Sequence, residues 1–151
     1  ELILASHIMT ATPQPEAFCL ALNVYHEARN QPVIGQIAVS EVVLNRVADD
    51  RYPGSICEVV YQAEYPDNDK RELPIRNRCQ FSWYCDGKPD QPTDIDAYRW
   101  ALVLSERILA GEFAPVTNGA THYHSVKVNP KWEINKIIVA KIKDHIFYRW
   151  D

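Results

Sequence analysis

The chain has 151 residues, 46% of them hydrophobic, which is enough apolar material for one globular domain with a core of its own. Its 16 basic and 20 acidic residues give a formal charge of −4 and form no basic stripe, which argues against nucleic-acid binding. No run of about 18 apolar residues is present, so we expect no membrane span. We therefore expect a single domain over residues 1–151, with 1–14 as a peripheral or flexible segment.

Three helices are predicted in the first part of the chain. Apolar residues recur at helical spacing over 15–29, and Asn30-Gln31-Pro32 then breaks the helix. A second helix is predicted over 33–48, and its apolar residues cover so much of its circumference that it should be central and buried. Ser55 is expected to cap a short third helix over 56–61.

The helical periodicity fails between residues 62 and 92, where prolines and charges are frequent. A loop of this length inside a compact domain is usually functional or mobile. Thr93 is then expected to cap a fourth helix over 94–110, and Gly111 to end it.

The pattern near the C-terminus is that of strands. One strand is predicted over 121–126, followed by a turn at 130–132 and a hairpin of strands 137–142 and 145–150 that turns at Lys143-Asp144. Helices first and strands last predict the α+β class, with a small antiparallel sheet at one end.

Four cysteines, an even number, allow two disulfides in three pairings. Cys79 and Cys85 are six residues apart and could be bridged across a turn, or could remain thiols. Cys19 lies in the middle of the first predicted helix, where we expect a buried thiol, with a disulfide to another cysteine as the less favoured alternative. The spacings fit no zinc pattern.

Glu27 is the first candidate for a catalytic residue. It stands near the end of the first predicted helix, with mostly apolar neighbours and with His26 and Arg29 close by. A carboxyl group with apolar surroundings keeps its proton near neutral pH and can act as a general acid. The alternative is a surface glutamate paired with a neighbour. Glu41, in the otherwise apolar second helix, is a weaker candidate for the second carboxylate of a glycosidase, and could instead be an exposed or helix-pairing residue.

Two further groups of residues could bind a ligand. Gln36 and Asn45 are polar residues of the buried second helix and could line a sugar cleft, or face solvent. The segment QFSWY at 80–84 combines an amide, a hydroxyl and three rings, which suits a carbohydrate wall. It could equally be a loop that Phe81 and Trp83 fix to the core.

His122 and His124 alternate with Tyr123 on a predicted strand, so both histidines should lie on one face. A His-x-His pair can bind zinc, although no HExxH spacing supports this, and we expect no metal. Three further histidines are available as extra ligands: His7, His26 and His145.

In six blocks, in order, the chain resembles the spore-cortex-lytic type of bacterial and phage cell wall hydrolases. The blocks extend over nearly the whole chain and are YHEARNQP (25–32), GQIAVSEVVLNRV (35–47), RYPGSICEVVYQ (51–62), CQFSWYCDG (79–87), ATHYHSVKVNPKW (120–132) and HIFY (145–148). Their uninterrupted run, without an added wall-binding domain or signal peptide, looks more like a phage endolysin than a spore germination enzyme.

The resemblance implies a lysozyme-like, transglycosylase-type fold with a helical lobe and a small β lobe. It also implies cleavage of the glycosidic bond between N-acetylmuramic acid and N-acetylglucosamine, with Glu27 of the (G/H)EAR block as catalytic acid. His26 stands where the spore enzymes usually have glycine, and Glu41 receives no catalytic role. A lytic transglycosylase needs one carboxyl group and no cofactor, and gives a 1,6-anhydro product.

On this basis we expect a monomer that acts on peptidoglycan glycan strands in the periplasm or outside the cell, with a phage holin as one route of release. The residues expected to line the glycan cleft are Gln36, Asn45, Gln80, Phe81, Ser82 and Tyr123. Three alternatives remain: a hydrolytic muramidase with a second carboxylate, a non-catalytic glycan-binding module, and a zinc amidase or peptidase built on His122 and His124.

Overall fold

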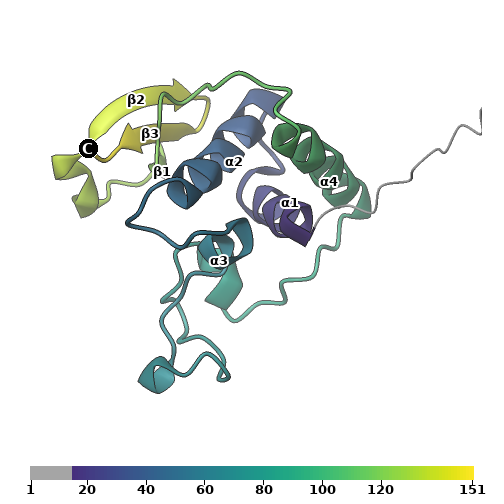
Figure 1. The fold of residues 1–151 in the computed structure, drawn as a ribbon, viewed down its shortest axis with the longest axis vertical. Coiled ribbons are helices and arrows are strands. Elements are labelled where there is room, and N and C mark those ends of the chain that lie inside the picture. The colour runs from purple at the N-terminus through teal and green to yellow at the C-terminus, as the bar shows by residue number, and fades with distance from the viewer. Residues whose placement is uncertain (1–14) are drawn as a thin grey trace, which may run out of the picture.

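The structure, a computed structural model, describes residues 15–151, so the segment expected over 1–14 lies outside the described residues. Helices come first and strands last, and Figure 1 shows the sheet at one end of the molecule. The elements are α1 (Pro15–Ala28), α2 (Val33–Val47), α3 (Ile56–Val60), α4 (Ile95–Leu109), β1 (His122–Ser125), β2 (Ile137–Ile142) and β3 (His145–Arg149). The predicted α+β class is therefore confirmed.

Helix α2 is the central element, as its apolar circumference predicts, and lies between the other helices and the sheet (Figure 1). On one side Val43 packs with Leu20 of α1 and with α3. On the other side Val39 packs with Phe147 of β3. All four of these side chains are fully buried, and each contributes about 1.5–3 kcal/mol to folding. Helix α2 thus joins the helical lobe to the sheet.

The sheet has the order β1-β3-β2, and both pairs are antiparallel. In the ladder Tyr123 lies opposite Phe147, with the ring centroids 5.5 Å apart. Opposite residues share a face of the sheet, and Phe147 is buried against α2. Tyr123 therefore faces the helical lobe, and His122 and His124 face the other way.

The start of α4 differs from the prediction. The N-cap is Asp94, whose side chain accepts a hydrogen bond from the Ala97 N–H at 3.1 Å. Thr93 lies one residue too early to cap a helix that begins at Ile95, and its N–H donates to the Tyr25 hydroxyl instead. The predicted turn at 130–132 continues as a 3-10 helix, Lys131–Asn135.

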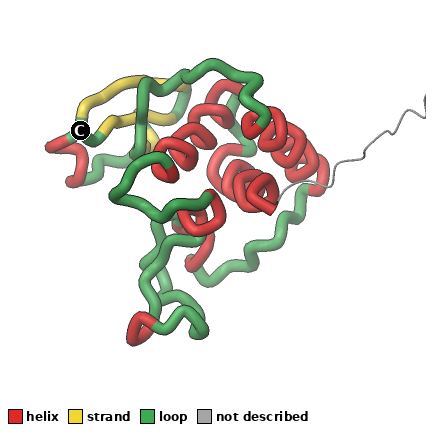
Figure 2. The backbone as a smooth tube through the Cα atoms, in the orientation of Figure 1, coloured by secondary structure: helices red, strands yellow, loops and turns green. Residues whose placement is uncertain are grey.

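The long loop between α3 and α4 extends away from the helices (Figure 2) and contains two short 3-10 turns, Pro66–Asn68 and Ser82–Cys85. A disulfide between Cys79 and Cys85 closes part of it, so of the two alternatives for this pair the bridged one is present. The loop is attached to the core through Trp83, which is 6% exposed and donates from Nε1 to Asn23 Oδ1 at 2.9 Å.

The expectation that Cys19 is an unpaired buried thiol is wrong. Cys19 forms a disulfide with Cys57, which links α1 to α3 across 38 residues of sequence. The two cysteines meet because α1 and α3 pack together, a contact that no local spacing reveals.

Within residues 15–151, no helix combines the length and the apolar character needed to cross a bilayer.

Candidate active site

Glu27 lies in the last turn of α1, and its half-buried side chain lines a cavity of about 260 Å³ where the helical lobe meets the sheet. Burial raises the pKa of Glu27 to about 7. The Tyr123 hydroxyl and the Arg46 charge act in the opposite direction, because both favour the ionised carboxylate. The group is therefore balanced between its two protonation states near neutral pH.

The end of α1 is fixed by contacts with the long loop. The His26 ring stacks on Trp83 at 4.6 Å, and its Nε2 lies 2.6 Å from the Asp90 carbonyl oxygen. The Tyr25 hydroxyl accepts hydrogen bonds from the N–H groups of Thr93 and Asp94, both at 3.1 Å. The two residues that precede Glu27 in α1 are thus held in place before any ligand binds.

Tyr123 is the one predicted cleft residue whose polar group acts directly on Glu27. Its hydroxyl is buried, and no group in residues 15–151 forms a hydrogen bond of good geometry with it. Burial and the nearby Glu27 carboxyl hold the pKa of Tyr123 well above its usual range, so the phenol keeps its proton. A neutral O–H beside Glu27 is available to donate to the ionised carboxylate.

Four cavity residues come from the sheet side and are not among the predicted cleft residues: Ser125, Lys127, Asp144 and His145. Gln31 Nε2 donates to Asp144 Oδ2 at 3.2 Å, which holds this second carboxylate at the cavity. Burial lowers the pKa of His145, so this imidazole is neutral at physiological pH. The hairpin turn at Lys143-Asp144 was predicted, but its position beside Glu27 depends on how the sheet packs against α2.

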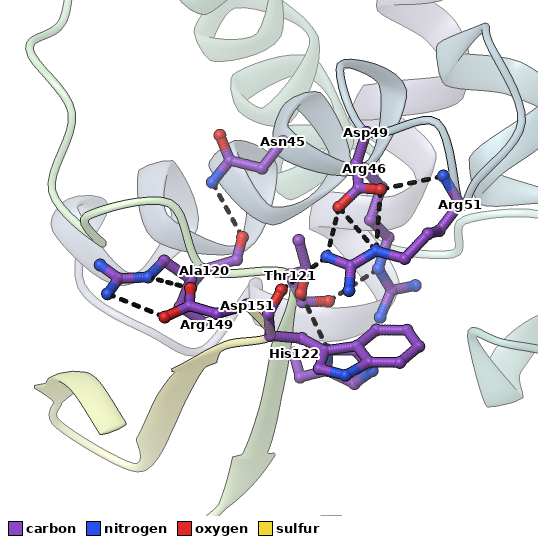
Figure 3. A network of polar contacts seen from close by, with 10 residues as sticks. Asn45, Arg46, Asp49, Arg51, Ala120, Thr121, His122, Arg149 and Asp151 are labelled. Atoms are coloured by element: carbon purple, nitrogen blue, oxygen red, sulfur yellow. Dashed lines mark hydrogen bonds and ion pairs between the residues drawn. The ribbon is translucent and has the colours of Figure 1, made fainter. Parts of the chain in front are cut away.

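The side chains of Gln36 and Asn45 are engaged within the protein. Gln36 Nε2 donates to the Ala28 carbonyl at 3.2 Å, and its Oε1 accepts from Trp100 Nε1 at 2.8 Å. Asn45 Nδ2 donates to the Ala120 carbonyl at 2.8 Å (Figure 3). The Asn45 side chain lines a different cavity from that of Glu27. Their glycan-binding role stays a prediction, because neither is brought to the cavity of Glu27.

The 80–82 segment divides between core and surface. Phe81 is 3% exposed and packs in the core, as the alternative interpretation of this loop predicts, whereas Gln80 and Ser82 are exposed. A contact of these three residues with glycan stays a prediction, and Phe81 has little surface to offer.

The Glu41 carboxylate holds the loop that follows α4. It accepts hydrogen bonds from the Val116 N–H at 2.8 Å, the Thr117 N–H at 3.2 Å and the Thr117 hydroxyl at 2.7 Å. Glu41 does not line the cavity of Glu27. Its contacts are those of a structural residue.

We expect Glu41→Gln to lower the free energy of unfolding by about 1–3 kcal/mol, because an amide cannot accept all three hydrogen bonds. Urea unfolding monitored by circular dichroism measures this loss. At temperatures where the variant is folded, its activity should match that of the wild type. A folded Glu41→Gln protein of unchanged stability that has lost activity would instead identify Glu41 as a catalytic carboxylate.

His122 and His124 make contacts within the β lobe. His122 Nδ1 pairs with the Thr121 hydroxyl at 3.0 Å, and His124 Nε2 with the Tyr148 hydroxyl at 2.8 Å. Burial, with nearby cationic side chains, lowers the pKa of His122 to about 4. In the described part of the chain, no three potential ligands form a group suited to a metal, and His7 lies outside that part.

We expect an activity that is high below pH 7 and falls as the pH rises through about 7. The sign follows from the raised pKa of Glu27, since a general acid works only while it carries its proton. Initial rates between pH 5 and 9 at substrate concentrations well below KM would reveal this basic limb, because kcat/KM reports the pKa of the free enzyme. A rate that stays constant up to pH 9 contradicts the role of Glu27 as the acid.

The fold agrees with comparisons to known proteins. The cell wall hydrolase family matches residues 30–148. A spore cortex-lytic enzyme of Halalkalibacterium halodurans is 40% identical over 129 residues, which are 85% of this chain and 33% of that protein. The spore cortex-lytic enzyme of Bacillus subtilis is 42% identical over 43 residues, 28% of this chain and 14% of that protein.

Two solved structures share the fold. The catalytic domain of the Bacillus cereus SleB protein has a TM-score of 0.61 at 25% identity, and the comparison covers 92% of this chain and 94% of that one. The catalytic domain of the germination-specific lytic transglycosylase SleB from Bacillus anthracis has a TM-score of 0.65 at 24% identity, covering 93% and 98%.

This chain belongs to the cell wall hydrolase family. It spans about a third of the length of the Halalkalibacterium relative. The match to the family begins at residue 30, after Glu27, so the case for this residue depends on its environment in the structure.

Proposed function

We propose that this chain degrades peptidoglycan by cleaving the β-1,4 bond between N-acetylmuramic acid and N-acetylglucosamine, with Glu27 as the general acid. The observation that carries the proposal is a half-buried carboxyl with a pKa of about 7 in an open cavity between the two lobes. The 40% identity to a spore cortex-lytic enzyme supports a cell wall glycan as substrate.

The mechanism we favour is that of a lytic transglycosylase. Glu27 protonates the glycosidic oxygen, and the N-acetyl group of the substrate stabilises the oxocarbenium-like centre at C1. Glu27, now ionised, takes the proton of the C6 hydroxyl, whose oxygen bonds to C1 and closes a 1,6-anhydro ring. A carboxyl with a pKa near the working pH suits both steps. The Tyr123 O–H can donate to the carboxylate between them.

A hydrolytic muramidase is the second candidate, because Asp144 provides another carboxylate at the same cavity. An inverting hydrolase holds its two carboxyl groups about 6.5–9.5 Å apart so that one can activate water. In such a mechanism Asp144 would be the base.

Mass spectrometry of the fragments released from purified peptidoglycan tests the proposal. Fragments with 1,6-anhydro ends support the transglycosylase, and reducing ends support the hydrolase. Binding to sacculi without release of any fragment overturns the proposal and identifies a glycan-binding module. Full activity in the presence of a chelator removes the zinc amidase or peptidase.

We further propose that the protein works at the cell wall, in the periplasm or outside the cell. Two disulfides, Cys19–Cys57 and Cys79–Cys85, suit an oxidising compartment. A phage endolysin released through a holin, and a monomeric state, remain predictions. The named relatives are bacterial spore enzymes.

A further inference from the structure

Arg46, in the last turn of α2, is a buried charge that the mechanism above does not use. Its side chain is 5% exposed. The guanidinium group lies over the rings of Tyr52 and Phe81, with its central carbon 5.2 Å from each ring centroid. Its Nε donates to the Thr121 carbonyl at 2.8 Å (Figure 3). The guanidinium is thus held in one orientation.

This cation lacks a direct counter-ion in the described part of the chain. No carboxylate there comes within ion-pair distance of Arg46, and its buried Nη1 makes no hydrogen bond within residues 15–151. A buried charge without a partner is costly to folding, so its presence calls for a functional explanation. Three acidic groups act on its charge: Tyr52, Tyr123 and Glu27. Glu27 is the carboxyl among them, and its pKa is about 7.

Arg46 also takes part in an anchor for strand β1. Asn45 and Arg46 are consecutive residues of α2, and they donate to the consecutive carbonyls of Ala120 and Thr121, both at 2.8 Å (Figure 3). Thr121 directly precedes β1 and is two residues before Tyr123 in the chain. The anchor therefore sets the position from which Tyr123 meets Glu27.

We propose that Arg46 is a positioning residue for the reaction assigned to Glu27: it holds β1 so that Tyr123 faces this carboxyl, and its charge stabilises the carboxylate once the proton has left. This inference depends on the proposed function for its role in catalysis. Its electrostatic part, the interaction of Arg46 with Glu27, can be measured in the resting protein.

Other charged and titratable groups surround the pair. Those beside Glu27 at the cavity are His26, Arg29, Lys127, Asp144 and His145. Arg29 and Lys127 are exposed, so water and salt screen their charges. On the β-lobe side Arg46 lies near His122. The pKa of His122 is lowered by burial and by the charges of Arg46, Lys136 and Arg51. Arg46 differs from the other cations in being buried.

The test is a pH titration of the Glu27 carboxyl by ¹³C NMR in the wild type, Arg46→Gln and Arg46→Lys, with the signal assigned by its absence in Glu27→Gln. Arg46→Gln keeps a donor for Thr121 but removes the charge, so the midpoint should move to higher pH. Arg46→Lys keeps the charge, so its midpoint should stay near that of the wild type. Arg51→Met, which removes an exposed arginine nearby, is the matched control and should not move it.

Activity supplies a second measurement. In Arg46→Gln the basic limb of the pH–rate profile should move up with the midpoint. In Arg46→Lys the limb should stay in place while kcat falls about tenfold to a hundredfold. Lysine lacks the guanidinium that donates to the Thr121 carbonyl, so β1 shifts and Tyr123 is misplaced.

A folded Arg46→Gln variant whose Glu27 midpoint equals that of the wild type overturns the inference. If Arg46→Gln does not fold, Arg46→Lys decides, and either a displaced midpoint or a kcat equal to that of the wild type overturns the inference. Failure of the proposed function would appear differently, as an active Glu27→Gln enzyme. The NMR midpoint does not depend on that activity.

Discussion

Glu27→Gln should abolish lysis of purified cell walls and lower kcat by at least about 10²- to 10⁴-fold, the usual share of a general acid. The amide has nearly the shape of the carboxyl but no proton to give to the glycosidic oxygen. Loss of turbidity of purified sacculi, together with mass spectrometry of released fragments, measures the effect. Glu106→Gln, at an exposed site of α4, is the control for loss of one carboxylate and should clear sacculi normally.

The same variant should be at least as stable as the wild type at alkaline pH. The pKa of Glu27 in the folded protein, about 7, exceeds the ordinary glutamate value of 4.5. The wild type therefore has this group's full stability below pH 4.5 and loses it as the pH rises through 7, by on the order of 3 kcal/mol. Glutamine does not titrate, so urea unfolding at pH 5 and pH 8 should show a smaller drop in the variant. An inactive variant that is also unfolded would not support the catalytic role, whereas full clearing by folded Glu27→Gln would refute it.

Removal of the Cys19–Cys57 disulfide, in a Cys19→Ser/Cys57→Ser variant, should lower the free energy of unfolding by about 3–4 kcal/mol. The bridge closes a loop of 38 residues, and its loss frees the unfolded chain. It also releases α1, which carries Glu27, from α3. Urea unfolding without reductant measures the loss of stability. Activity at the temperature where half of the variant is unfolded measures the effect of releasing α1.

The second disulfide provides the matched control. Cys79→Ser/Cys85→Ser opens a loop of only six residues, for which the same relation predicts a loss of about 2 kcal/mol. The ordering of the two variants is the critical result. Equal stability of the wild type and the Cys19→Ser/Cys57→Ser variant would show that packing alone holds α1 against α3.

Several site residues could not be identified from the pattern of the chain. Arg46 is visible as an arginine in an apolar helix, but a long side chain can reach solvent from such a position, and only packing decides that it does not. Asp144 and Lys127 carry no local signal that relates them to Glu27. The polarity of Asn45 suits a cleft residue, and only the structure shows that its amide donates to the Ala120 carbonyl.

The sequence by itself determined the helices, the hairpin, the fold class and the candidate acid Glu27, because these depend on periodicity, caps and turn residues a few positions apart. The tertiary structure alone decided the Cys19–Cys57 pairing, the burial of Arg46, and the meeting of Glu27 with Tyr123 and Asp144. Those contacts join residues that are tens of positions apart. They exist because α2 packs against both α1 and the sheet, and no local pattern encodes the alignment of three separate elements.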